Sequence, residues 1–466
     1  MTGIKCSEAK KRMLRFLGRN FSGESIQPGQ IVSLAIPVLI DQSFILGLNM
    51  FNTAMISSSG VTAVSAVNMV DSLNVLLLNV LIAVATGGTV VVAQYQGSQN
   101  PEMVSRSTEQ TVFAVPVFGA AMAVLLIVLR DPTLLLLFGS AERGVFANAR
   151  IYLLGSALSY PAFGFYQACC CCLRGVGKTK PALILSMIAN LSYVALNILL
   201  IQILHLGVTG MSAALNLARL TGAICSFFFL ARFDHSFCFE WKNALKPNLS
   251  IQKRILFIGL PFAAEQIFFN GGKLLTQTFI VQLGTMALTA NAIAWSFVLI
   301  LQIPCNTVSI VSVTVVGQCM GRRLIGDARK FIRSFVILSD VSLALFLLML
   351  APLLPKLILL FSPPPQVVPH VMSAVLLTAL AQPVLWSPSF IIPAAIRAAG
   401  DAKYTSAVSL VCMWGVRVFG GWFLALPMGM GLVGIYLAMV VEWAVRSVIF
   451  LIRLKGKKWY AHHVID

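Results

Sequence analysis

Long apolar segments alternate with short polar ones along almost the whole chain. A helix needs roughly 20 mostly apolar residues to cross ~30 Å of hydrocarbon, and twelve segments meet that requirement. The pattern therefore predicts an all-α integral membrane protein with twelve transmembrane helices. These are residues 31–56, 66–95, 108–129, 147–171, 181–204, 208–231, 255–282, 287–318, 334–359, 368–394, 404–427 and 430–452.

Composition supports a membrane protein. Hydrophobic residues make up 58% of the chain and charged residues only 11%, whereas soluble globular domains carry about 25% charged residues. The ten cysteines include the run Cys169–Cys172 near the end of a predicted helix. We interpret that run as small packing residues, and we predict neither a disulfide framework nor a structural metal site.

The basic residues are distributed unevenly along the chain. Of 34 Lys and Arg, 26 lie in the N-terminal segment, in alternate loops and at the C-terminus, and only four lie in the opposite loops. An excess of Lys and Arg marks the cytoplasmic loops of membrane proteins. The distribution predicts cytoplasmic termini and contact with anionic lipids. It also explains the net charge of +18 without nucleic-acid binding.

The chain contains an internal repeat with an offset of 224 residues. LAIPVLIDQSF (34–44) returns as IGLPFAAEQIF (258–268), and VVAQYQG (91–97) returns as VVGQCMG (315–321). Each repeat carries six predicted helices, so the two lobes have the same orientation and a pseudo-two-fold axis along the membrane normal. Parallel repeats of this kind are a transporter architecture, with the substrate site between the halves.

The repeat predicts five regions. They are a cytoplasmic segment, 1–30, with a candidate amphipathic helix, an N-lobe, 31–231, a cytoplasmic linker, 232–254, a C-lobe, 255–452, and a cytoplasmic tail, 453–466.

Three motifs resemble, in sequence and in order, those of the multidrug and toxic compound extrusion (MATE) exporters. They are AQYQG, LRGVGKTKP (173–181) and TVVGQCMG. The resemblance covers residues 31–455 and is greatest to a bacterial branch. It implies a monomeric multi-pass protein of the bacterial cytoplasmic membrane that exports small organic, cationic or amphipathic compounds in exchange for H⁺ or Na⁺. No enzymatic activity or cofactor is implied, and no ATP-binding GxxxxGK[ST] loop occurs.

Asp41 and Glu265 are repeat-related acids inside apolar segments. Asp41 is ten residues into its predicted helix, which is a depth of ~15 Å. A charge there costs about 2.5–3.5 kcal/mol on insertion scales, so such residues face a cavity or a partner. We expect both acids, with Gln42 and Gln266, to hold either a proton or a cation such as Na⁺ or the substrate. The alternative is an acid that only pairs with Arg or Lys of the other half.

Pro37 and Pro261 lie four residues before these acids. A proline inside a helix removes one backbone hydrogen bond and bends the helix. We therefore predict hinges at both positions.

Three further ionisable residues within the predicted helices are candidates for a functional role. Lys273 follows Glu265 by eight residues, ~12 Å along one helix face, and is either an internal cation that competes for the acid or a side chain reaching the headgroups. Asp71 is a candidate gate residue in the outer half of its helix. Arg417 needs an anionic partner.

The candidate partners of Arg417 are Asp41, Glu265 and Glu442. Glu442 is also four residues before Arg446, which predicts an ion pair within one helix.

The chain departs from the family at three positions. Asn52 and Asn197 stand where many members carry aspartate, and Phe269 stands at the seventh-helix glutamate position. Asparagine cannot exchange a proton, although its carbonyl can bind a substrate or Na⁺. The departures therefore shift the predicted coupling to Asp41 and Glu265.

Three other functions are alternatives to drug export. A flippase or exporter of a lipid-linked or anionic metabolite on the same scaffold would use Lys273 and Arg417 to hold the anion. An intramembrane enzyme is disfavoured because no HExxH motif or Ser–His arrangement occurs. A channel does not need duplicated lobes.

Overall fold

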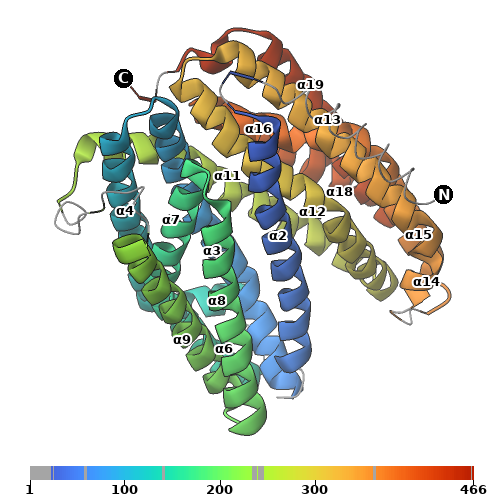
Figure 1. Cartoon of the computed structure of the whole chain (residues 1–466). Coiled ribbons are helices and arrows are strands. Elements are labelled where there is room, and N and C mark those ends of the chain that lie inside the picture. Colours follow the sequence, from blue (N-terminus) through green and yellow to red (C-terminus); the bar gives the residue numbers. More distant parts are fainter. Residues whose placement is uncertain are drawn as a thin grey trace, which may run out of the picture. The chain divides into compact units, whose positions relative to one another are not determined.

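The computed structural model describes residues 23–24, 26–56, 60–138, 142–233, 239, 246–359, 361, 364–462 and 464–465. Across these residues the chain forms helices and turns, and no strand (Figure 1). The predicted all-α class is therefore confirmed.

Eleven helical segments of the described residues are long and apolar enough to cross a membrane. Each of them overlaps one of the predicted transmembrane segments. They are Pro28–Leu48, Thr62–Gly97, Pro101–Val128, Thr179–Ile203, Gly207–Ala231, Leu249–Gln282, Thr285–Gly321, Ile325–Lys356, Val368–Ala398, Ala402–Ala425 and Gly431–Lys455.

The remaining predicted segment, 147–171, forms two shorter helices. These are α6 (Arg143–Leu158) and α7 (Tyr160–Val176), which meet at Ser159. Pro161 follows in the first turn of α7, and proline has no backbone N–H to continue the hydrogen-bond ladder. The Ser159 hydroxyl donates to the Ser156 carbonyl at 2.6 Å. The predicted twelfth crossing is therefore an interrupted helix.

One compact unit comprises residues 36–266. Its hydrophobic core contains Val67, Leu81, Tyr152 and Tyr160 among other buried side chains. Its helices after α2 (Pro28–Ile56) are α3 (Val61–Gly97), α4 (Pro101–Val128), α5 (Arg130–Phe138), α6, α7, α8 (Thr179–Asn197), η2 (Ile198–Ile203), α9 (Gly207–Phe228), η3 (Phe229–Phe233) and the first part of α11 (Leu249–Gln282).

The other compact unit combines residues 1–35 with 267–466. Its helices after α11 are α12 (Thr285–Gly321), α13 (Ile325–Leu350), η4 (Ala351–Leu353), α14 (Leu354–Leu359), α15 (Val368–Ala381), η5 (Gln382–Trp386), α16 (Ser387–Ala398), α17 (Ala402–Val411), η6 (Cys412–Phe419), α18 (Gly420–Ala425), α19 (Gly431–Lys455) and η7 (Lys458–Tyr460).

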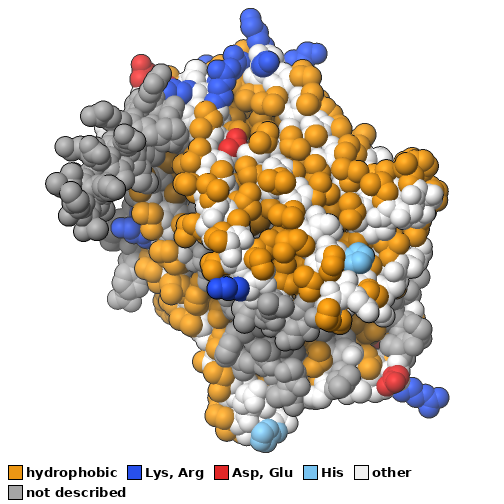
Figure 2. Space-filling view, turned by 90° about the vertical axis from the view of Figure 1, so that its right-hand side faces the viewer, with side chains coloured by type: hydrophobic (Ala, Val, Ile, Leu, Met, Phe, Trp, Pro, Cys, Tyr) orange, Lys and Arg blue, Asp and Glu red, His pale blue; other side chains and the backbone are white. Residues whose placement is uncertain are grey.

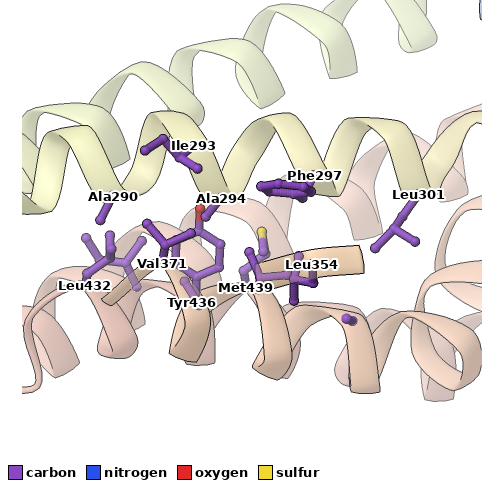
Figure 3. Close-up of a cluster of buried hydrophobic side chains, with 14 of the residues drawn as sticks. Ala290, Ile293, Ala294, Phe297, Leu301, Leu354, Val371, Leu432, Tyr436 and Met439 are labelled. Atoms are coloured by element: carbon purple, nitrogen blue, oxygen red, sulfur yellow. The ribbon is translucent and has the colours of Figure 1, made fainter. Parts of the chain in front are cut away.

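The core of this second unit forms around one face of α12. Figure 3 shows Ala294 and Phe297 of that face directed toward Val371, Tyr436 and neighbouring side chains on the helices opposite. Alanine at the closest positions lets the helices approach, and larger residues fill the space on either side. Packing of this kind drives helix association where lipid is as apolar as the protein.

Two helices run through the division between the units. α2 (Pro28–Ile56) is divided between Ala35 and Ile36, and α11 is divided between Gln266 and Ile267. Each is a continuous helix with an internal proline near the division, Pro37 or Pro261. The predicted lobes begin at 31 and 255, so the observed units assign the first parts of these two helices differently.

Large hydrophobic side chains are exposed on many of these helices, including Val124, Leu348 and Leu380 at 60–72% relative exposure. On the face in Figure 2 hydrophobic atoms cover most of the surface, and Lys and Arg gather near its upper end. A surface this apolar is expected of helices that contact lipid.

α3 packs tightly against the first part of α11 through two glycines. A Cβ at Gly87 would lie 2.4 Å from the Ile255 carbonyl oxygen, and one at Gly259 would lie 3.0 Å from the Val84 Cα. Both obstacles are backbone atoms, which cannot move aside without shifting a helix.

Gly87→Ala is therefore expected to destabilise the protein by about 1–3 kcal/mol, the usual cost of overpacking. The thermal unfolding midpoint in detergent measures the effect. Gly47→Ala is the matched control, because Gly47 lies inside α2 with no atom within 4 Å of its would-be Cβ. Equal midpoints for the two variants would contradict the close α3–α11 contact.

Candidate functional site

Asp41 lies in α2 and is bound by a cation of its own half of the chain. The Arg174 Nη2 donates to Asp41 Oδ2 at 2.8 Å; the Asp41 side chain is buried and that of Arg174 is half-buried. The other carboxylate oxygen, Oδ1, is buried and has no partner among the described atoms. The predicted acid is therefore an ion-paired one, and its partner is not in the other half.

Local sequence fixes where Arg174 lies. Gly177 adopts φ +95°, which ends α7 with a left-handed turn in which its N–H donates to the Arg174 carbonyl at 3.0 Å. Glycine takes this conformation without steric cost. Arg174 is thus held in the last turn of α7, and Asp41 lies beside that helix end.

The other residues of the two PxxxD/E segments are buried or half-buried. Glu265 is buried on α11, and Gln42 and Gln266 are half-buried. Pro37 is buried in α2, and Pro261 is half-buried in α11.

Asp71 in α3 belongs to a polar network of neutral donors. Its Oδ1 accepts hydrogen bonds from the Tyr152 hydroxyl at 3.0 Å and from the Asn74 amide at 3.2 Å. The Asn74 carbonyl accepts from the Tyr160 hydroxyl at 2.7 Å. Arg219 of α9 donates to Ser159 and lies 4.9 Å from the Phe163 ring centroid. The hydrogen bonds of Asp71 and Asn74 join α3 to α6 and α7, and Arg219 brings a charged side chain of α9 to the junction of α6 and α7.

Sequence reasoning found Asp71 and missed its partners. Asn74 follows Asp71 by three residues, so its place on the same helix face could have been inferred. Tyr152 and Tyr160 are 81 and 86 residues from their acceptors, and no spacing rule connects them.

Asn197 ends α8 directly before the π-helix η2. Its side chain is 1% exposed, and its Oδ1 has no partner among the described atoms. The side chain of Asn52 lies outside the described residues.

In the second unit Glu442 of α19 binds two arginines. Arg446 Nη1 donates to Oε1 at 3.0 Å, and Arg417 Nη1 lies 3.5 Å from Oε2. The predicted pair within α19 is present, and Glu442 is the partner of Arg417 among its three predicted candidates. Arg446 also donates to the Ser409 hydroxyl at 3.1 Å.

Arg417 retains unused donors. Its Nη2 meets only the sulfur of Met439, at 2.9 Å, and its buried Nε has no partner among the described atoms. It lies in η6, a π-helical segment of α17–α18. π-helical turns occur frequently at functional sites because they change the direction of side chains.

Lys273 of α11 points its ammonium group at aromatic rings. Nζ lies 4.8 Å from the Phe269 ring centroid and 5.5 Å from that of Trp295 on α12. The Arg417 guanidinium lies 6.0 Å from the same Phe269 ring. No ion pair of Lys273 occurs among the described residues. Phe269 stands where the family resemblance places a glutamate, so an acid is replaced by a ring that holds two cations.

The MatE family model matches residues 37–199 and 261–423. The two matches begin at Pro37 and Pro261, which reproduces the internal repeat, and together they cover more than half of the chain. The protein belongs to the MATE family of efflux transporters.

Known relatives of this MATE transporter align over almost their whole length. The uncharacterized transporter YisQ of Bacillus subtilis is 23% identical, covering 92% of this chain and 94% of that protein. The probable multidrug resistance protein NorM of Thermotoga maritima is 24% identical, covering 94% of each.

A solved structure has the same fold. It is a MOP superfamily transporter from Pyrococcus furiosus, with a TM-score of 0.83 and 17% identity over 91% of this chain and 94% of that one. Its authors describe a binding pocket whose reverse polarity suggests a different function. The prediction of a multi-pass efflux transporter rather than an enzyme is confirmed.

The Asp41–Arg174 pair gives a testable consequence for stability of this MATE transporter. Arg174→Gln leaves a buried carboxylate without its cation and is expected to cost about 3–5 kcal/mol. The double variant Asp41→Asn/Arg174→Gln removes both charges and is expected to recover at least half of the loss. Thermal midpoints of the wild type, both single variants and the double variant complete the cycle. Additive effects of the two substitutions would contradict the pairing.

Proposed function

We propose that this MATE transporter is a secondary active antiporter that exports small organic amphipathic compounds, cationic ones among them, in exchange for H⁺ or Na⁺. Relatives named as multidrug resistance proteins support drug export. Repeats of the same orientation fit alternating access, in which the two halves rock around a fixed site. The protein acts as a monomer and needs no cofactor.

The proposed topology has twelve membrane crossings in two six-helix lobes and both termini in the cytoplasm of a bacterial cell. Eleven crossings are the candidate spans, and the interrupted helix α6–α7 makes the twelfth. The excess of Lys and Arg in alternate loops supports the orientation.

The observation that carries the antiport proposal is the Asp71 carboxyl, which is bound by a phenol and an amide and by no ion pair among the described residues. Hydroxyl and amide donors can turn to serve either the ionised or the protonated carboxyl. The group can thus exchange H⁺ for Na⁺ or for a cationic part of the substrate. Asp41 and Glu265 are the other coupling candidates, with Gln42, Gln266, Asn52 and Asn197 as polar groups around a bound cation.

Asp71→Asn is expected to reduce gradient-driven efflux by at least about tenfold, because the amide cannot change its charge. The measurement uses proteoliposomes loaded with a cationic dye and an applied gradient of H⁺ alone or Na⁺ alone. The gradient that drives the wild type identifies the coupling ion. Asp41→Asn and Glu265→Gln in the same assay show whether either acid is also required.

Asp131→Asn is the matched control. Asp131 lies in the short helix α5 outside the membrane spans, where hydrogen bonding to Arg130 holds the pKa of its carboxyl below the usual value. It is therefore ionised throughout the pH range of the assay and exchanges no proton. Wild-type efflux by Asp71→Asn would refute the coupling role of Asp71.

Pro37 and Pro261 are proposed hinges, because α2 and α11 each continue from one compact unit into the other near their internal proline. Pro37→Ala restores a backbone donor and straightens α2. We expect efflux to slow several-fold with the unfolding midpoint preserved or raised. Pro101→Ala is the control, since Pro101 begins α4, where proline breaks no hydrogen bond. Unchanged efflux by Pro37→Ala would exclude a hinge there.

One observation favours the alternative cargo named above. The membrane helices of the second unit hold Lys273, Arg417 and Arg446 against Glu442, which is a net positive set that could hold a lipid-linked or anionic metabolite.

A further inference from the structure

The unusual feature of the second unit is an excess of buried and half-buried cations. Lys273, Arg417 and Arg446 lie within its membrane helices, and Glu442 is the acid that pairs with two of them. Asp340 of α13 is another acid in these helices, and no basic side chain lies within ion-pair distance of it among the described residues. Glu265 lies on α11 eight residues before Lys273, in the part of that helix assigned to the other unit. Glu442 can neutralise one of its two arginines, so two of the three cations have no ion-paired acid of their own among the described residues.

Excess charge in hydrocarbon is costly and normally marks a ligand path. Snorkelling to the headgroups would lower the cost for Lys273, but its ammonium group is turned toward two rings instead. Cation–π contact contributes about 0.5–2 kcal/mol, less than the insertion cost of about 2.5–3.5 kcal/mol. The rings therefore position the cation without fully compensating it.

Lys273 and Arg417 lie near the same aromatic ring. Lys273 Nζ and the Arg417 guanidinium both lie against Phe269. Arg417 keeps an unpartnered Nε beside an Nη2 that meets only a sulfur. These two nitrogens form one edge of the planar guanidinium. Such an edge binds a carboxylate or a phosphate through two parallel hydrogen bonds.

We infer that Lys273 and Arg417 form a binding site for the anionic group of an organic cargo, a carboxylate or a phosphate attached to an aromatic or apolar body. The N–H groups of Arg417 Nε and Nη2 donate hydrogen bonds to two oxygens of the acid group, and Lys273 supplies the second positive charge. Phe269 and Trp295 contact the apolar body of the cargo. Glu442 and Arg446 hold Arg417 in place. This inference rests on the proposed export function and specifies its substrate class as compounds that carry an acid group, zwitterions included.

The test compares two fluorescent ligands that differ in one group, a rhodamine with a free carboxyl and its methyl ester. Binding to the purified protein is measured by fluorescence polarisation. The wild type is expected to bind the acid about tenfold more tightly than the ester. Lys273→Gln should lose this preference, and Lys273→Arg should retain it. Lys356→Gln, a change at an exposed lysine outside the site, should behave as the wild type.

Arg417→Gln should also lose the preference for the acid. This variant leaves Glu442 with one arginine, so its thermal unfolding midpoint is measured together with its binding. If Arg417→Gln is unfolded, the result for Lys273→Gln decides the test. Benzoate should displace the bound acid, whereas chloride at the same concentration should not. Equal affinity of the wild type for acid and ester, no binding of either, or displacement by chloride would overturn the inference.

Transport separates this inference from the antiport proposal. Gradient-driven efflux of the ester with no preference for the acid in binding refutes the anion site and leaves the antiporter standing. A preference for the acid that depends on Lys273, without gradient-driven efflux of either dye, supports the site and refutes the antiport proposal.

Discussion

Charges inside a membrane have no water to solvate them, so each must find a partner within the protein or in a ligand. Most of the buried charges in this transporter satisfy that constraint in pairs, as in Asp41–Arg174 and Glu442–Arg446. Where a charged group has no ion-pair partner, it is available to bind a proton, an ion or a ligand. The Asp71 carboxyl has neutral partners, and the Lys273 ammonium group has aromatic ones. Asp71 in one unit and Lys273 in the other, neither of them in an ion pair among the described residues, distinguish the two units more than their helical folds do.

The repeat preserves helix ends and interruptions while the polar residues diverge. Gly177 and Gly400 both take positive φ and end a helix one turn after Arg174 or Arg397. The break at Ser159 corresponds at the repeat offset to Pro383, the second residue of the π-helix η5. By contrast, Asp71 corresponds to Trp295 at the repeat offset. A shared backbone plan thus carries an acidic site in one half and a basic, aromatic site in the other.

The sequence predicted what depends on short-range patterns. Apolar segment lengths located the helices, and the four-residue spacing of Glu442 and Arg446 located their ion pair. Partners distant in sequence were beyond such rules. Nothing near Asp41 indicated Arg174, because the contact depends on how α2 packs against the end of α7. The rings beside Lys273 were equally hidden, since Trp295 comes from another helix.

The division of α2 and α11 between units also constrains how the chain can be made. Residues 23–35 leave the ribosome before residues 36–466, yet they belong to the compact unit that is completed by residues 267–466. That unit cannot close until synthesis is nearly finished, whereas the unit of residues 36–266 can close earlier. A cut in the linker at 232–254 would not yield two self-contained halves, because each fragment would carry part of a helix that belongs to the other unit. The first part of α2 can therefore complete its compact unit only after the C-terminal residues have been synthesised.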